Sequence, residues 1–191
     1  MKKSIVFLMV MFAAVLLSAG DYKVLLLGDI HFDALKYHTS PDGKIKSRYS
    51  KPHTAMWAKK QAHALLAAAA KMLDKDFPFV IQAGDFIEGC GATEALRGEM
   101  MTDAFKTVKG FFPEHKLLVV KGNHDIRQDV RISVNGKTKI VNGSDHKSYD
   151  KYFLPLVAKE LGRQKLASSF AVTHDNDLYI FTTVLATEQK Q

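Results

Sequence analysis

Three short apolar runs organise the first two thirds of the chain. A glycine followed by polar residues comes directly after the first two runs, and after Lys121 in the third. The runs cover Tyr22 to Leu27, Phe79 to Ala83 and Leu117 to Val120. Continuous apolar runs of this length predict strands that are buried on both faces, as in a sheet covered by helices.

Helical periodicity fills the intervals between these runs. From Thr54 to Leu73 apolar residues recur at steps of three and four, with lysines on the opposite face. A second helix is predicted from Thr93 to Val108, with Thr93 as its N-cap and Gly110 just past its end. Strands that alternate with helices predict βαβ units and a largely parallel sheet. The predicted fold class is therefore α/β, a βαβ-built sheet layered with helices.

The remaining segments are shorter and more polar. Residues 33 to 52 contain Pro and Gly and predict a loop, and Tyr149 to Leu161 predicts a short helix that Pro155 starts or kinks. Two hairpins or loops are expected where turn residues separate apolar stretches. The first spans Arg127 to Ser148, with turn signals at Asn135-Gly136 and Asn142-Gly143, and the second joins Ser169–Val172 to Leu178–Val184.

The N-terminus has the pattern of a secretory signal peptide. Lys2 and Lys3 precede an apolar run from Ile5 to Leu17, and small residues follow at positions 18 to 20. This run is shorter than the roughly 20 apolar residues that cross a bilayer. We expect a signal peptide over residues 1–20 and one domain over residues 21–191, with a secreted or periplasmic location. An uncleaved N-terminal anchor is the alternative.

Composition narrows the class further. The chain is 47% hydrophobic and 25% charged, which is typical of a globular protein and argues against disorder. Its net charge of +7 suits an anionic substrate, but the charge forms no long basic run that would indicate a nucleic-acid scaffold. The single cysteine, Cys90, excludes internal disulfides and is expected to be a buried free thiol.

Chemistry gathers where the three predicted strands end. Asp29 and His31 follow the first strand, Asp85 the second, and Asn123 and His124 the third. In a parallel sheet such ends lie side by side along one edge, which is where α/β proteins place their sites. A buried cluster of this polarity needs partners, and a divalent metal site provides them.

The spacing suggests a role for each residue. Asp29 and His31 stand two apart, so both can bind one cation, while the Asp85 carboxylate can bridge to a second cation that Asn123 also binds. Mixed oxygen and imidazole ligands suit zinc, iron or manganese better than calcium. His124 is then placed as a general acid, with Asp125 able to orient its ring.

These three segments resemble the first three motifs of the calcineurin-like metallophosphoesterases, in the order of that family. The segments are Gly28-Asp29-Ile30-His31, Gly84-Asp85-Phe86-Ile87-Glu88 and Gly122-Asn123-His124-Asp125. The resemblance implies the family's four-layer sandwich and two divalent metal ions. By the same resemblance Asp29 and His31 bind the first ion, Asp85 bridges, Asn123 binds the second, and His124 lies by the leaving group.

Two features depart from the family pattern. Glu88 stands where purple acid phosphatases have a metal-binding tyrosine, so that branch is not expected. The family completes its site with later histidines, including a Gly-His-x-His motif, and these are absent from the sequence. His174 is the one histidine of this part of the chain; it is either a substitute ligand or an exposed turn residue.

Residues in the loop after the first motif carry two interpretations. Tyr37 and His38 either border the substrate or are ordinary loop residues. The basic run of Lys44, Lys46, Arg48 and Lys51 either binds a phosphate or forms a solvated loop. His53 is expected to be a solvated side chain at the end of an element.

The predicted function is that of an exported, metal-dependent phosphoesterase. Its substrate would be a phosphate monoester or diester, on a small molecule or a macromolecule, cleaved at a dinuclear metal site. The sequence carries no specific nucleic-acid signal and no membrane segment beyond the N-terminus, and it does not predict an oligomeric state. The rival interpretation is a truncated or degenerate metal-binding remnant without activity, incomplete at its C-terminus.

Overall fold

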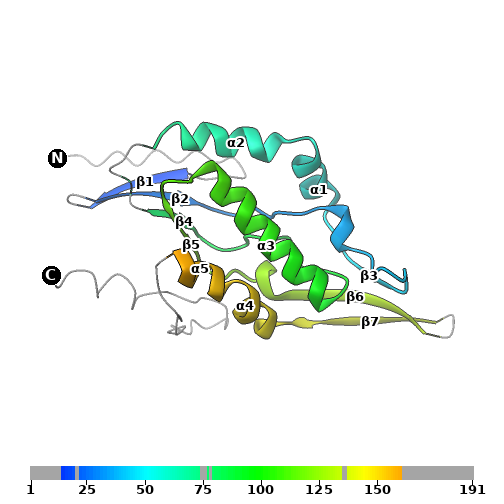
Figure 1. Ribbon diagram of the computed structural model, residues 1–191. Helices are drawn as coiled ribbons and strands as arrows, with labels where there is room; N and C mark the ends of the chain where they lie inside the picture. The colour runs from blue at the N-terminus through cyan, green and yellow to red at the C-terminus, as the bar shows by residue number, and fades with distance from the viewer. Residues whose placement is uncertain (1–13, 20–21, 74–76, 78, 135–136, 161–191) are drawn as a thin grey trace.

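A four-stranded sheet forms the centre of the protein in the computed structural model (Figure 1), which describes residues 14–19, 22–73, 77, 79–134 and 137–160. Its strands lie in the order β1-β2-β4-β5. β2, β4 and β5 are parallel, and β1 pairs antiparallel with β2 at the edge. The strands are β1 (Ala14–Ala19), β2 (Tyr22–Leu27), β4 (Phe79–Gln82) and β5 (Lys116–Val119).

Helices connect the parallel strands and cover the sheet. Two helices, α1 (Lys51–Ala58) and α2 (Gln61–Ala70), lie between β2 and β4 in the chain, and α3 (Glu94–Phe111) lies between β4 and β5. In space α3 packs between α2 on one side and α4 (His146–Tyr152) on the other, while α5 (Leu154–Glu160) contacts β5 (Figure 1). The predicted α/β class with a parallel βαβ-built sheet is confirmed.

A small antiparallel sheet extends beyond the carboxyl ends of the central strands. It has the order β3-β6-β7, from β3 (Ile45–Ser47), β6 (Arg127–Val134) and β7 (Lys137–Ser144). The predicted hairpin is therefore present, and its strands fill most of the predicted range from Arg127 to Ser148. The second turn signal was wrong, because Asn142 and Gly143 lie inside β7 and pair with Asp129 and Gln128.

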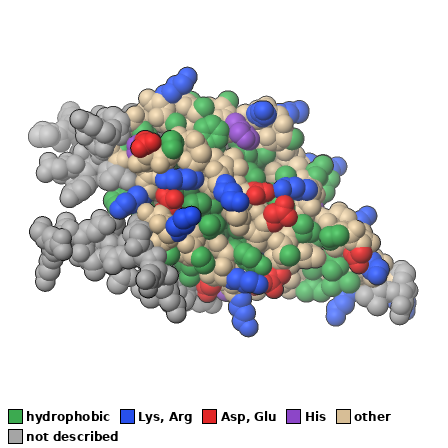
Figure 2. Space-filling model, viewed as in Figure 1, with side chains coloured by type: hydrophobic (Ala, Val, Ile, Leu, Met, Phe, Trp, Pro, Cys, Tyr) green, Lys and Arg blue, Asp and Glu red, His purple; other side chains and the backbone are tan. Residues whose placement is uncertain are grey.

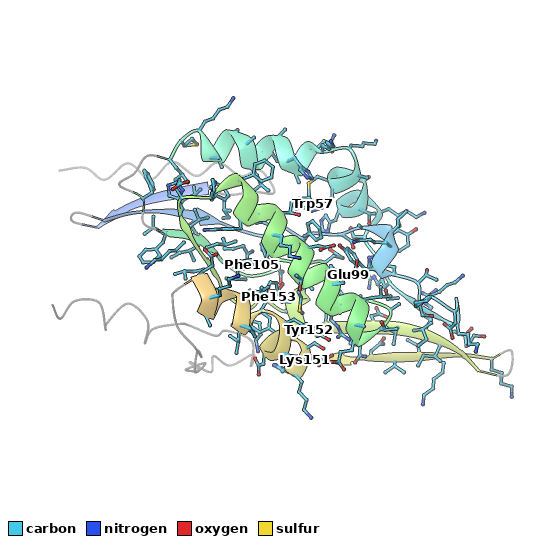
Figure 3. All side chains as sticks on the ribbon, in the orientation of Figure 1. Trp57, Glu99, Phe105, Lys151, Tyr152 and Phe153 are labelled. Atoms are coloured by element: carbon cyan, nitrogen blue, oxygen red, sulfur yellow. The ribbon has the colours of Figure 1, made fainter. Side chains whose placement is uncertain are left out.

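The core lies between the central sheet and the helices. Leu25, Val80 and Leu117 of the sheet are fully buried, and Phe105 of α3 and Phe153 after α4 are buried beside them (Figure 3). The Phe153 ring packs on Phe86, with ring centroids 5.3 Å apart. Cys90 is a buried free thiol, as predicted, and burial raises its pKa to about 11.

Several helix boundaries differ from their predicted positions because of local backbone and capping interactions. The first helix begins at Lys51 because the Ser50 side chain accepts a hydrogen bond from the backbone N–H of His53, at 3.4 Å. It is broken before Gln61, since Lys60 adopts a left-handed conformation with φ of 57°. Thr93 caps α3 as predicted, but α3 continues through Gly110 to Phe111.

The edge strand β1 lies within the stretch for which we predicted a signal peptide. Its residues pair with β2 from Ala14 opposite Leu27 to Ala19 opposite Tyr22. Cleavage after residue 20 would make β2 the edge of the sheet; the signal peptide itself stays a prediction. Within the described ranges, no helix combines the length and apolar character needed to cross a membrane.

A substitution on α3 tests the packing of this helix against α4. A Cβ atom added at Gly98 would collide with the ring of Tyr152 (Figure 3). We expect Gly98→Ala to lower the free energy of unfolding by about 1 to 2 kcal/mol, because relief requires moving that ring. Urea denaturation followed by circular dichroism measures this change.

Gly110, near the other end of the same helix, provides the matched control. An added Cβ at Gly110 meets nothing within 4 Å. Gly110→Ala should therefore raise the stability, by up to about 1 kcal/mol, through helix propensity alone. Equal effects of the two substitutions would contradict the described contact between α3 and Tyr152.

Candidate metal centre

The loops that follow β2 and β4 run side by side beyond the ends of their strands. The backbone N–H of His31 donates to the Asp85 carbonyl and that of Phe32 to the Phe86 carbonyl, each at 2.9 Å. The Glu88 N–H returns a bond to the Phe32 carbonyl at 3.0 Å. Parallel pairing thus continues past the sheet and places the first two motifs side by side.

The loops that follow β4 and β5 are joined still more closely. An added Cβ at Gly84 would lie 3.2 Å from Gly122 Cα, and one at Gly122 would collide with Asp85. The fully buried Asp125 carboxylate accepts the Ile87 N–H at 3.0 Å and the Gly122 N–H at 2.8 Å. Burial raises the pKa of Asp125 to about 7, although these backbone donors lower it.

Three of the predicted ligands have unusual backbone conformations. Asp29, His31 and Asp85 have φ angles of 43°, 45° and 51°, in the left-handed region that residues other than glycine rarely adopt. Each such residue costs on the order of 1 kcal/mol or more, and such strain concentrates at functional sites. At Asp85 this conformation coincides with the close packing of the loops, because a Cβ added at Gly122 would collide with that residue.

One cluster of potential metal ligands contains His31, Asp85 and His124. One donor atom from each lies within 4.8 Å of the others. The distance from His31 Nε2 to Asp85 Oδ2 is 3.9 Å, and the His31 and His124 ring centroids are 4.6 Å apart. The other Asp85 oxygen, Oδ1, accepts the His124 N–H at 2.9 Å, which fixes the carboxylate between the loops.

A second cluster contains His31, His53 and Glu88, and it shares His31 with the first. Glu88 Oε2 lies 2.5 Å from His53 Nδ1 and 3.2 Å from His31 Nδ1. The imidazole rings of His31 and His53 are stacked with centroids 4.4 Å apart. Glu88 is therefore the common partner of two histidines that come from different segments.

These contacts change the ionisation of both partners. Burial raises the pKa of Glu88, but His31, His53 and His124 outweigh it and bring the pKa to about 2. Burial lowers the pKa of His31, yet the carboxylates of Glu88, Asp85 and Asp29 together raise it above its ordinary value of 6.5. The site therefore favours a carboxylate–imidazolium pair in the metal-free protein.

In both motif histidines Nδ1 faces Glu88, so Nε2 is the nitrogen that can bind a metal or transfer a proton. His124 Nδ1 lies 3.0 Å from the Glu88 carbonyl oxygen and must donate to it, so Nε2 is the other, free nitrogen. His31 directs Nδ1 toward the Glu88 carboxylate and Nε2 toward Asp85. A ring held from behind by a carboxylate is the usual arrangement of a metal-binding histidine.

The other predicted site residues lie at the rim. Asp29 is exposed and is close enough to affect the pKa of His31, but it belongs to neither cluster. Asn123 is also exposed, and within the described part of the chain its side chain has no hydrogen-bond partner. His174 and the predicted hairpin from Ser169 to Val184 lie outside the described residues.

Three interpretations of individual residues need correction or addition. Asp125 contacts the backbone of both loops as described above, and its predicted contact with the His124 ring stays a prediction. The idea that Tyr37 and His38 border the substrate is wrong, because their exposed fractions are 1% and 3% and both are hydrogen-bonded internally. Sequence reasoning missed His53, since only the Ser50 cap shows that it lies in the first turn of α1.

The residues present fit a bound divalent metal. Imidazole and carboxylate donors suit zinc, iron and manganese. His31 Nε2 and Asp85 Oδ2 lie 3.9 Å apart, beyond hydrogen-bond distance, so one ion could be held by both atoms. The residues that would hold metal are His31 and Asp85, together with Asp29 and Asn123 at the rim.

The loops after the parallel strands carry potential metal ligands, so the structure is that of an α/β protein with a candidate metal site. The sequence profile of the calcineurin-like phosphoesterases matches residues 22–185. The chain therefore belongs to the calcineurin-like phosphoesterase family, and by family it is a metal-binding phosphoric ester hydrolase. No curated protein and no solved structure gives a match.

The contact between Gly122 and Asp85 gives a direct test of loop packing at this centre. Gly122→Ala would place a Cβ against the Asp85 backbone and carboxylate. We expect metal affinity, measured by calorimetric titration with Mn²⁺ or Zn²⁺, to fall by about 10- to 100-fold. The matched control is Gly28→Ala, where a Cβ meets nothing within 4 Å; an equal loss there would contradict the interpretation.

Glu88 gives the metal-free protein a characteristic dependence of stability on pH. Its pKa falls from 4.5 to about 2 on folding, so its contribution is present above pH 4.5 and is lost as the pH falls toward 2. His31 has a raised pKa, so its contribution is present below pH 6.5 and is lost as the pH rises above that value.

We therefore expect Glu88→Gln to destabilise the metal-free protein most between about pH 4.5 and 6.5, by about 1 to 3 kcal/mol. Urea denaturation at several pH values measures the difference from the wild type. Glu114→Gln, at an exposed position, serves as the control. A stability difference that does not vary with pH would show that the ion pair is not formed.

Proposed function

We propose that this protein hydrolyses a phosphate monoester or diester at a dinuclear metal site held by Asp29, His31, Asp85 and Asn123. The observation that carries the proposal is the convergence of His31, Asp85 and His124 at the carboxyl end of a parallel sheet, in a member of the calcineurin-like family. Zinc, manganese and iron are the metals that this donor set favours.

Each residue has a defined task in this proposal. Bound divalent ions supply the Lewis acidity that polarises the phosphate and makes water a better nucleophile. His31 and Asp85 hold that site, with the Asp85 carboxylate fixed by the His124 N–H. In its protonated form His124 donates Nδ1–H to the Glu88 carbonyl and presents Nε2–H, whose proton passes to the departing oxygen.

The cellular location is part of the proposal and rests on the N-terminal sequence. The two lysines and the apolar run from Ile5 to Leu17 support export, so the substrate would be met outside the cytoplasm.

The rival proposal is a metal-binding protein that does not turn over substrate. It is favoured by one observation: Asp29, which is predicted to bind the first ion, belongs to neither cluster of potential ligands among the described residues. Binding of one metal equivalent without hydrolysis would support this rival.

The decisive variant is Asp85→Ala, assayed with Mn²⁺ or Zn²⁺ on phosphate monoesters and diesters. We expect kcat/KM to fall by at least about a hundredfold, because the carboxylate that joins the loops and faces His31 is lost. Asp150→Ala, at an exposed position of α4, should keep wild-type activity. Absence of metal-dependent hydrolysis by the full-length protein would overturn the enzyme proposal.

A further inference from the structure

A basic cavity lies beside the small sheet, away from the clusters described above. It has a volume of about 680 Å³ and is formed by β3 with its flanking residues and by β6 and β7. Its cationic side chains are Lys44, Lys46, Arg48, Lys51 and Arg131. Several Lys and Arg side chains also stand out at the end of the molecule that carries α1, β3 and the hairpin (Figure 2).

The charge of this basic cavity is poorly compensated. No Asp or Glu is among the described residues that line it. Lys44 lies 3.6 Å from Asp42 and Arg48 lies 3.9 Å from Asp129, both at the long end of ion-pair distances. Within the described ranges, Lys46, Lys51 and Arg131 have no ion-pair partner. Cations gathered in this way repel one another, and an anion bound among them would be favoured.

The remaining lining residues suit a phosphate group. Ser133 and Thr138 offer hydroxyl groups, and Tyr49 offers an aromatic ring that is 39% exposed. Hydroxyl groups and cationic nitrogens together are the donors that bind phosphate oxygens. The volume falls in the range of about 300 to 1,000 Å³ that is usual for small-molecule sites.

Buried hydrogen bonds tie the wall of the basic cavity to the metal centre. The Ser47 hydroxyl lies 2.7 Å from His38 Nδ1, and His38 Nε2 lies 2.6 Å from Asp33. The other Asp33 oxygen accepts the Thr54 hydroxyl of α1 at 2.8 Å. Asp33 stands two residues after His31, so this chain of bonds links β3, the loop of the first motif and α1.

The first turn of α1 contributes residues to both the basic cavity and the metal centre. Lys51 lines the basic cavity, and His53, two residues later, contacts Glu88 of the metal centre at 2.5 Å. A ligand in the basic cavity would thus contact the same turn of α1 that contacts the metal centre. Such a shared frame is what a substrate with two binding points requires.

We propose that the basic cavity is a substrate subsite that binds a second phosphate group, distant from the phosphorus that reacts. The protein would then select esters that carry two phosphate groups at separate positions of one molecule, such as nucleoside bisphosphates, over simple monoesters. This inference rests on the proposed function for its reaction, but binding in the cavity does not depend on turnover.

The binding test uses the metal-free protein in chelator, so that metal complexes of the ligand do not interfere. Pyrophosphate, a nucleoside bisphosphate and a short single-stranded oligonucleotide are titrated by calorimetry. The variant K46Q/K51Q/R131Q removes three cations of the cavity, and K59Q/K106Q/K147Q removes three exposed lysines elsewhere. Circular dichroism verifies that both variants fold.

We expect the cavity variant to weaken pyrophosphate and nucleoside bisphosphate binding at least about tenfold, and the control variant to change it less than about twofold. If both variants weakened binding equally, the loss would come from the lower net charge of the protein and not from the cavity, and the proposal would be overturned. Binding of the oligonucleotide alone would also overturn it, in favour of a nucleic-acid surface.

The kinetic test compares substrates with one and two phosphate groups on the metal-loaded enzyme. In the cavity variant, the ratio of kcat/KM for the doubly phosphorylated ester to that for the monoester should fall at least about tenfold. An unchanged ratio would overturn the proposal. Loss of all hydrolysis with retained pyrophosphate binding would instead overturn the proposed function and leave the binding site standing.

Discussion

The site depends on one buried carboxylate, that of Asp125, which joins the loops after β4 and β5. Its two oxygens accept backbone N–H groups from Ile87 and Gly122, and it does so while fully buried. Without it, two backbone donors would be buried without partners. Because the loops are held this closely, Gly84 and Gly122 touch, and Asp85 and His124 are placed within reach of His31.

Glu88 adds a second constraint from the side of α1. Its carboxylate meets both His31 and His53, and its carbonyl faces the ring of His124. One residue thus contacts three histidines, and it does so at a position where a related branch of the family carries a metal-binding tyrosine. The first turn of α1 is thereby part of the centre, and the same turn reaches the basic cavity through Lys51.

Much of this could be predicted from the sequence, because strand ends carry strong signals. The apolar runs located β2, β4 and β5. The three matched motifs predicted a cluster of Asp29, His31, Asp85, Asn123 and His124, of which the structure brings His31, Asp85 and His124 together. His53 escaped prediction because its position depends on where α1 begins. The roles of Asp125 and Glu88 depend on loop packing, which no spacing along the chain reveals. Asn142 and Gly143 misled because a turn signal inside a strand is overridden by pairing with β6.

The central claim is that His31 and Asp85 hold metal at the end of the parallel sheet. Crystals grown with Mn²⁺ and measured at wavelengths on both sides of the manganese absorption edge would test it most directly. The account predicts an anomalous peak within coordination distance of His31 Nε2 and an Asp85 carboxylate oxygen, with His31 Nδ1 still facing Glu88. A fully loaded protein whose only manganese peaks lie elsewhere would contradict it.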